Sequence, residues 1–243
     1  MCGYKGLMAV AVLGVLAAGG LPAKAAVVID DFSKPDSPVV TLISFLNPDQ
    51  TLIKTVDASI LGGERDVLID VLGNPSPISY AGVVGGGIFM FGSFGAAGVV
   101  ATLQYDGLDG DVAGPPGQLV NAEGLGGVDL TSYGSEFYFD FLSADSGSGA
   151  VIDILIRVNS IAQSSIFSGG IPESPSSLTF LAPFSSFSDP SVFQNATSIE
   201  VKLNPNGTPN VDFELDTFGI PEPATLSLLG LGAVAALGRR RKR

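Results

Sequence analysis

Apolar and polar residues alternate along several short segments of this chain. From residue 152 to residue 158, every second position is Ile or Val, with Asp153 and Arg157 on the opposite parity. Successive side chains of a strand point to opposite faces, so this period of two predicts a strand with one buried face. The same alternation predicts strands at residues 67–71, 137–141 and 199–203.

Turn-forming residues separate these segments. The chain has 32 glycines and 16 prolines, which leave few stretches long enough for a helix. Because a strand with one apolar face needs a second sheet to cover it, we predict an all-β fold with a single β-sandwich at residues 26–219. One short helical turn is expected at residues 189–193, where Asp189 can cap the turn and Pro190 suits its first position.

Residues 81–100 carry no charge and are long enough to span a membrane. Seven of these twenty residues are glycine, which interrupts helices and suits turns between buried strands. A span here would also leave the basic C-terminal residues outside, against the positive-inside tendency. We therefore predict a buried hairpin for this segment.

The N-terminal residues have the three zones of a signal peptide. Lys5 precedes an uncharged apolar stretch at residues 6–20, and Ala23 and Ala25 form the small-x-small pattern that signal peptidase recognises. We predict cleavage after Ala25, so that residues 1–25 are removed as a signal-peptide helix. The single cysteine, Cys2, would leave with this segment, and the exported chain would contain no disulfide.

The C-terminal residues also form three zones. Pro221, Glu222 and Pro223 come first, then fifteen uncharged residues at 224–238, and finally a basic tail that includes Arg239, Arg240 and Arg241. Fifteen helical residues measure about 22 Å, against about 30 Å for the hydrocarbon core of a membrane. We predict a short transmembrane helix that is a marginal anchor, with its basic end on the cytoplasmic side.

This order of zones resembles the PEP-CTERM sorting signal, and we assign residues 220–243 to it. The resemblance implies an exported protein of a Gram-negative bacterium that is held transiently in the inner membrane and processed by an exosortase. It also implies delivery to the cell surface or extracellular matrix and an association with exopolysaccharide. The alternative is an ordinary tail anchor that is never processed.

Charge and composition narrow the chemistry. Residues 26–219 contain 23 acidic and five basic residues, a net charge of −18, which disfavours nucleic acid as a partner. The chain has no histidine and no tryptophan. Without histidine, and with its only cysteine in the signal peptide, the usual transition-metal sites and nucleophile pairs are missing, so carboxylate and calcium chemistry remain.

A second resemblance rests on the order of the predicted elements. The exported chain opens with an acidic strand at residues 28–32 and closes with another at 211–218, and between them residues 126–141 and 187–203 each read as a turn entering a strand. This succession is similar to a galactose-binding-type jelly roll, in which the first and last strands are neighbours. The resemblance implies a jelly-roll-like sandwich and, as an alternative function, a carbohydrate-binding module.

Two groups of acidic residues are candidates for calcium, which binds six to eight oxygen atoms. Three carboxylates lie within six residues in a glycine-containing loop, and three others belong to the two terminal strands. The candidates are Asp106, Asp109 and Asp111, and, as the rival group, Asp30, Asp31 and Asp216. Both groups are also explained without a metal, the first as a plain turn and the second as solvated charges on edge strands.

The sequence does not indicate an enzyme, since no pair of its many carboxylates stands out as the acid and base of a glycosidase. Sugar binding would need aromatic platforms, and without tryptophan these are Tyr80, Tyr105, Tyr133, Tyr138 and exposed phenylalanines. We therefore expect a structural protein of the surface or matrix, with a sugar-binding module as the alternative. Signal peptidase, exosortase and exopolysaccharide are the expected partners.

Overall fold

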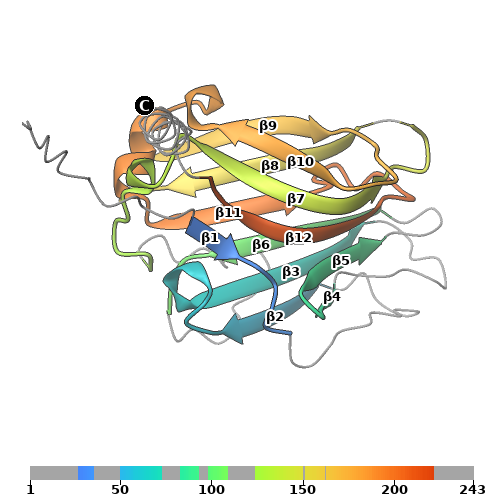
Figure 1. Cartoon of the computed structure of the whole chain (residues 1–243), viewed down its shortest axis with the longest axis horizontal. Coiled ribbons are helices and arrows are strands. Elements are labelled where there is room, and N and C mark those ends of the chain that lie inside the picture. Colours follow the sequence, from blue (N-terminus) through green and yellow to red (C-terminus); the bar gives the residue numbers. More distant parts are fainter. Residues whose placement is uncertain are drawn as a thin grey trace, which may run out of the picture.

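The computed structural model of the chain describes residues 27–35, 50–72, 83–92, 98–108, 124–149, 151–161 and 163–221. In these residues two six-stranded sheets pack face to face (Figure 1), and we call them sheet A and sheet B. Sheet A consists of β1 (Val27–Asp30), β4 (Val83–Gly85), β5 (Ile88–Gly92), β7 (Glu136–Asp145), β10 (Leu178–Pro183) and β12 (Asp212–Ile220). Sheet B consists of β2 (Gln50–Val56), β3 (Glu64–Leu72), β6 (Gly98–Tyr105), β8 (Ile152–Asn159), β9 (Ser164–Ile171) and β11 (Ser198–Leu203).

The chain passes repeatedly from one sheet to the other. Sheet A has the order β10-β7-β12-β5-β4, with β1 also paired to β12, and sheet B has the order β2-β3-β6-β11-β8-β9. The strand pairs within both sheets are antiparallel. Two antiparallel sheets joined by many crossing connections are the architecture of a jelly roll, so the predicted all-β, jelly-roll-like sandwich is confirmed.

The four strands predicted from alternation are present as β3, β7, β8 and β11; β3 and β7 extend several residues beyond the pattern, and β8 and β11 extend one residue beyond it. In β8 the burial alternates residue by residue, with Ile152, Ile154 and Ile156 buried and the residues between them partly exposed. The apolar parity of each strand therefore faces the other sheet, as the period of two requires.

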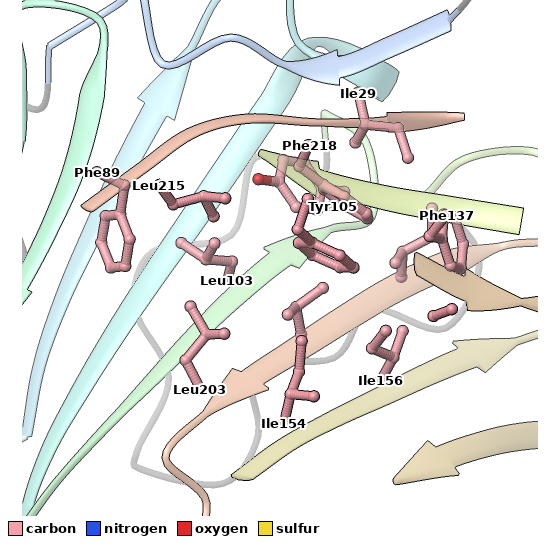
Figure 2. Close-up of a cluster of buried hydrophobic side chains, with 14 of the residues drawn as sticks. Ile29, Phe89, Leu103, Tyr105, Phe137, Ile154, Ile156, Leu203, Leu215 and Phe218 are labelled. Atoms are coloured by element: carbon pink, nitrogen blue, oxygen red, sulfur yellow. The ribbon is translucent and has the colours of Figure 1, made fainter. Parts of the chain in front are cut away.

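The interior between the sheets is rich in phenylalanine. Figure 2 shows Phe89, Phe137, Leu215 and Phe218 from sheet A pointing toward side chains of sheet B such as Leu103. Several rings are stacked: the centroids of Phe139 and Phe218 are 4.4 Å apart at an interplanar angle of 10°. Each fully buried phenylalanine contributes about 1.5–3 kcal/mol, so these rings are a major part of what holds the sheets together.

The uncharged segment at residues 81–100, predicted to be one buried hairpin, forms a hairpin at residues 83–92, whereas residues 98–100 begin β6 in the other sheet. Residues 81–82 and 93–97 lie outside the described residues. β4 and β5 pair through a turn at Gly86 and Gly87, whose φ values of +67° and +85° suit glycine. Phe89 and Phe91 of β5 are buried, whereas Met90 between them is exposed. Within the part of the chain that the structure describes, no helix is long and apolar enough to cross a membrane.

Four short 3-10 helices complete the described elements: η1 (Leu61–Gly63), η2 (Leu130–Ser132), η3 (Phe184–Ser186) and η4 (Pro190–Asn195). The last is the predicted helical turn. The Asp189 side chain accepts a hydrogen bond from the Ser191 N–H at 3.0 Å, and Pro190 occupies the first helical position.

The first and last strands are neighbours, as the jelly-roll resemblance implies. β1 lies antiparallel to the end of β12, with Val27 opposite Ile220 and Val28 opposite Gly219. Figure 1 shows β1 alongside β12 at the same end of sheet A. The first and last described strands therefore reach one corner of the molecule.

Candidate functional site

Three buried carboxylates gather on the outer face of sheet B. Glu64 and Asp66 belong to β3 and Asp106 directly follows β6, and each offers an oxygen within 4.8 Å of the others. Among the described residues, no other group of three acidic, histidine or cysteine side chains meets this distance. We call these residues the acidic cluster; its three oxygens are of the kind that calcium prefers.

Two further side chains belong to the surroundings of the acidic cluster. The Gln104 amide donates a hydrogen bond to Asp106 Oδ2 at 2.6 Å, and the Lys54 ammonium forms an ion pair with Glu64 Oε1. Lys54 is 28% exposed and Glu64 only 1%. The cluster therefore combines three carboxylates with one ammonium group and one amide, all on neighbouring strands.

Strand register continues this polar character across the outer face of sheet B. Lys54 lies opposite Asp66, Asp66 opposite Gln104, Gln104 opposite Glu200, and Glu200 opposite Arg157. Glu200 Oε1 is 3.3 Å from Arg157 Nη1. The row thus contains two acids, two bases and one amide, in contrast to the apolar rows on the inner face.

Asp30, a residue of the rival calcium group, is buried inside the sandwich and bound to other side chains. Its carboxylate lies 2.6 Å from Arg65 Nη1 and accepts a hydrogen bond from the Tyr105 hydroxyl at 3.2 Å. Arg65 also donates to the carbonyl of Lys34, and its guanidinium lies 5.4 Å from the centre of the Phe32 ring. Burial raises the pKa of Asp30, while the charge and hydrogen bond of Arg65 act in the opposite direction.

The structure does not bring the other predicted calcium ligands together with Asp30. Asp31 is exposed and accepts the Ser33 N–H at 3.0 Å, which closes a local turn. Asp216 is partly exposed and accepts the Thr217 hydroxyl at 3.2 Å. Asp109 and Asp111 lie outside the described residues, so Asp106 is the described residue of the loop group.

The tyrosines lie in three different settings. Tyr105 is fully buried beside Asp30 and cannot stack on a sugar, Tyr133 is partly buried against the core, and Tyr80 lies outside the described residues. Tyr138 lies across Gly219 on the outer face of sheet A: a Cβ at Gly219 would be 2.7 Å from Tyr138 Cε1. Burial, followed by the negative charges of Asp140 and Asp216, raises the pKa of Tyr138.

Tyr138 belongs to an apolar row on sheet A. By register Leu181 lies on one side of it, and Gly219 and then Val28 lie on the other. Leu181 is 47% exposed and Val28 41%. A tyrosine ring lying over a glycine, between apolar neighbours and near carboxylates, is a flat surface of the kind on which a sugar ring can stack.

The other end of the described chain leads directly into the predicted sorting signal. β12 ends at Ile220, which is fully buried, and Pro221 follows it. Glu222, Pro223, Arg239, Arg240 and Arg241 lie outside the described residues, as do Ala23 and Ala25 of the predicted signal-peptide cleavage site.

Residues 219–242 match the family model of the PEP-CTERM protein-sorting motif. The chain carries a PEP-CTERM sorting motif. It is therefore an exported, exosortase-processed protein.

Two solved structures are similar to this chain, and both are of the family 11 carbohydrate-binding module of Clostridium thermocellum. The module of a cellulosomal cellulase is 15% identical, with a TM-score of 0.36 over 82% of this chain and 96% of the module. The module in complex with a β-1,3-1,4-mixed-linked tetrasaccharide is 14% identical, with a TM-score of 0.35 over 82% of this chain and 98% of the module. No curated protein matches the chain. The strand order and registers, rather than these low scores, establish the fold.

Sequence reasoning found Asp106 but missed its neighbours Glu64 and Gln104. A signal was present, because Glu64 and Asp66 share one parity of β3, and Gln104 and Asp106 share one parity in and just after β6. What the sequence lacked was the pairing of these two strands, which places Asp66 opposite Gln104.

Proposed function

We propose that this chain is a structural protein of the cell surface or extracellular matrix of a Gram-negative bacterium, associated there with exopolysaccharide. In this proposal the apolar residues 224–238 anchor the protein transiently in the inner membrane, and an exosortase then releases the folded sandwich. The observation that carries the proposal is the sorting motif at residues 219–242, which overlaps the last two residues of β12. An anchor of about 22 Å suits a temporary rather than a permanent attachment.

The charges of the sandwich suit life in a hydrated matrix. The net charge of −18 over residues 26–219 keeps such a domain soluble and discourages it from binding anionic lipid or nucleic acid. The described phenylalanines of the interior pack with one another, so few aromatic rings remain for binding sugars. These features favour a structural role over a dedicated sugar-binding role.

The test is the intact mass of the protein isolated from the surface or matrix fraction of its host. We expect the mass of a chain that begins at Ala26 and ends near Pro223. A variant with Glu222→Ala should remain in the membrane fraction with its basic tail attached, if the motif is what the exosortase recognises. Wild-type protein that retains Arg239, Arg240 and Arg241 in the matrix fraction would refute the proposal.

Sugar binding is the second candidate, and the observation that favours it is the exposed row around Tyr138. The matched test compares Tyr138→Ala with Tyr133→Ala, because Tyr133 packs against the core instead of crossing a glycine on the sheet surface. If Tyr138 stacks on sugar, its loss should weaken retention on secreted polysaccharide by about tenfold, equivalent to about 1.4 kcal/mol. Equal retention of the two variants and the wild type would favour the structural role.

A further inference from the structure

We propose that docking of β1 against the end of β12 limits how fast the sorting motif is processed. The inference rests on the proposed sorting function and adds a point of control to it. Its basis is the position of β1, which pairs with Phe218, Gly219 and Ile220 and so holds the first residues of the matched motif inside sheet A.

The last residues of β12 depend on β1 for one of their two edges. At Asp212–Leu215, β12 lies between β7 and β5. From Thr217 to Gly219 it still pairs with β7, but its other neighbour is now β1, which pairs with Phe218, Gly219 and Ile220. Without β1, this part of β12 would present an open edge that can pair with another extended chain or separate more easily from the sheet.

β1 is held in place by buried side chains. Ile29 and Phe32 are 0% exposed, and the Phe32 ring stacks on Phe89 with centroids 5.9 Å apart. Between them Asp30 forms its ion pair with Arg65 of β3, so the segment is fastened to both sheets. β1 is therefore a docked strand whose release exposes apolar surface and separates a buried ion pair.

Almost no spacer separates this docked region from the predicted anchor. Ile220 is 0% exposed, and the carbonyl oxygen of Pro221 lies so close to Gly134 that a Cβ there would be 2.5 Å from it. Only Glu222 and Pro223 lie between Pro221 and the apolar residues that start at Ala224. Two extended residues span at most about 7 Å, so an anchored, folded domain would lie directly against the bilayer.

An enzyme in the membrane must bind several residues around the sorting motif. When β1 is docked, the residues before Pro221 are part of a sheet, and the domain blocks the approach from that side. When β1 separates, the end of β12 can leave the sheet and supply the extended segment that an enzyme requires. The processing rate should then follow the fraction of molecules in which this corner is open.

A reversible lock tests this directly. Val27 and Ile220 lie opposite each other, and directly paired residues of antiparallel strands have Cα atoms about 4.5–5.5 Å apart, within the range for a disulfide. The variant Val27→Cys with Ile220→Cys, in the full chain, is incubated in membranes that contain the exosortase. We expect its oxidised form to lose the C-terminal segment at least tenfold more slowly than the same variant reduced with dithiothreitol. Equal rates would overturn the inference.

A second variant does not disturb the core. Ten Gly/Ser residues inserted between Ile220 and Pro221 should move Pro221, Glu222 and Pro223 away from the domain and speed processing at least threefold. The matched control carries the same insertion between Gly86 and Gly87, an exposed turn with no atom within 4 Å of either Cβ position. The control should be processed at the wild-type rate. No acceleration in the first variant, or equal acceleration in both, would overturn the inference.

The two proposals fail in different ways. If the wild-type chain is never processed although the exosortase processes another substrate in the same membranes, the sorting proposal and this inference both fall. If the wild type is processed, but neither the lock nor the insertion changes the rate, only the control by β1 is refuted.

Discussion

Consecutive residues of β3 carry charge in two different environments. Arg65 points between the sheets, is 0% exposed, and forms an ion pair with Asp30. Glu64 and Asp66 point to the opposite face, where they join Asp106 in the acidic cluster and Glu64 pairs with Lys54. Among the described contacts, the charge inside the sandwich is a pair of one guanidinium and one carboxylate, whereas on the outer face three carboxylates lie together and Lys54 pairs with one of them.

The two groups of buried charges should therefore contribute differently to stability. A buried ion pair is costly to form, and removing one partner leaves the other charge without compensation in a medium of low dielectric constant. The three outer carboxylates are also buried, but Lys54 is 28% exposed, so solvent partly screens its ion pair with Glu64. We therefore expect loss of Arg65 to destabilise the protein more than loss of Lys54, and salt to act through the net charge of the sandwich.

The largest effect is expected from breaking the inner pair. Arg65→Met should lower the free energy of unfolding by about 3–5 kcal/mol, because Asp30 would stay buried without its cation. The double variant Asp30→Leu with Arg65→Met should recover most of this loss, since two apolar side chains can replace a buried pair at little cost. Urea unfolding of the processed protein measures both. A single variant as stable as the wild type would show that the pair does not hold the sheets together.

A smaller loss is expected from removing the base of the outer cluster. Lys54→Met keeps the aliphatic part of the side chain but leaves Glu64 beside two other carboxylates. Lys54 is 28% exposed, so the loss should lie between that of a surface pair and that of a buried pair, at about 2 kcal/mol. Lys34→Met is the control, because Lys34 pairs with Asp57 while 49% exposed. Equal losses in the two variants would remove the distinction between this cluster and ordinary surface charge.

The effect of cations distinguishes general screening from a specific site. We expect calcium, magnesium and sodium chlorides at matched ionic strength to raise the melting temperature equally above that in EDTA at low salt, since each screens the net charge of −18. Calorimetric melting of the processed protein gives the comparison. A rise with calcium alone, lost in Asp106→Asn and kept in Asp31→Asn, would contradict this expectation and locate a calcium site at the acidic cluster.

The smallest effect on stability is expected from a pair of neighbouring carboxylates outside the acidic cluster. Asp212 of β12 lies opposite Asp145 of β7, and burial, followed by the charge of Asp145, raises the pKa of Asp212 above 3.8. A raised pKa means that the folded state binds the proton more tightly, so the repulsion destabilises the protein above the raised pKa and disappears below the unfolded pKa. Asp145→Asn should therefore stabilise at pH 7 by about 0.2–1 kcal/mol, with little gain at pH 3. Urea unfolding at the two pH values measures this, and an equal gain at both would exclude charge repulsion as the cause.

The fold could largely be predicted from the sequence, because its strands are local patterns. Alternation within β8 or β11 needs no knowledge of the partner strand, and the glycines at 86 and 87 indicate the hairpin turn by their conformational freedom alone. The sorting motif is likewise a continuous segment. Its three zones can be recognised without any tertiary contact, and the family model matches residues 219–242, one residue earlier at each end than the predicted 220–243.

The acidic cluster and the inner pair could not be predicted in this way. Asp30 and Arg65 are 35 residues apart, and Tyr105 is 75 residues from Asp30, so their meeting depends on which strands become neighbours. Composition indicated that carboxylates matter but gave no means of selecting partners among 24 acidic residues. Arg65 has the same parity on β3 as the core residues Val67 and Ile69 and is buried with them. A pattern of apolar residues does not predict a charged residue at such a position.

The stacked phenylalanines also determine how this molecule can be observed. The chain contains fifteen phenylalanines, five tyrosines and no tryptophan, so its ultraviolet absorbance and intrinsic fluorescence are weak. Rings held in fixed pairs, such as Phe184 and Phe193 with centroids 4.0 Å apart, lie in an asymmetric environment. The fine structure of phenylalanine in near-ultraviolet circular dichroism should therefore be pronounced in the folded protein, and its disappearance on heating would report the separation of the two sheets.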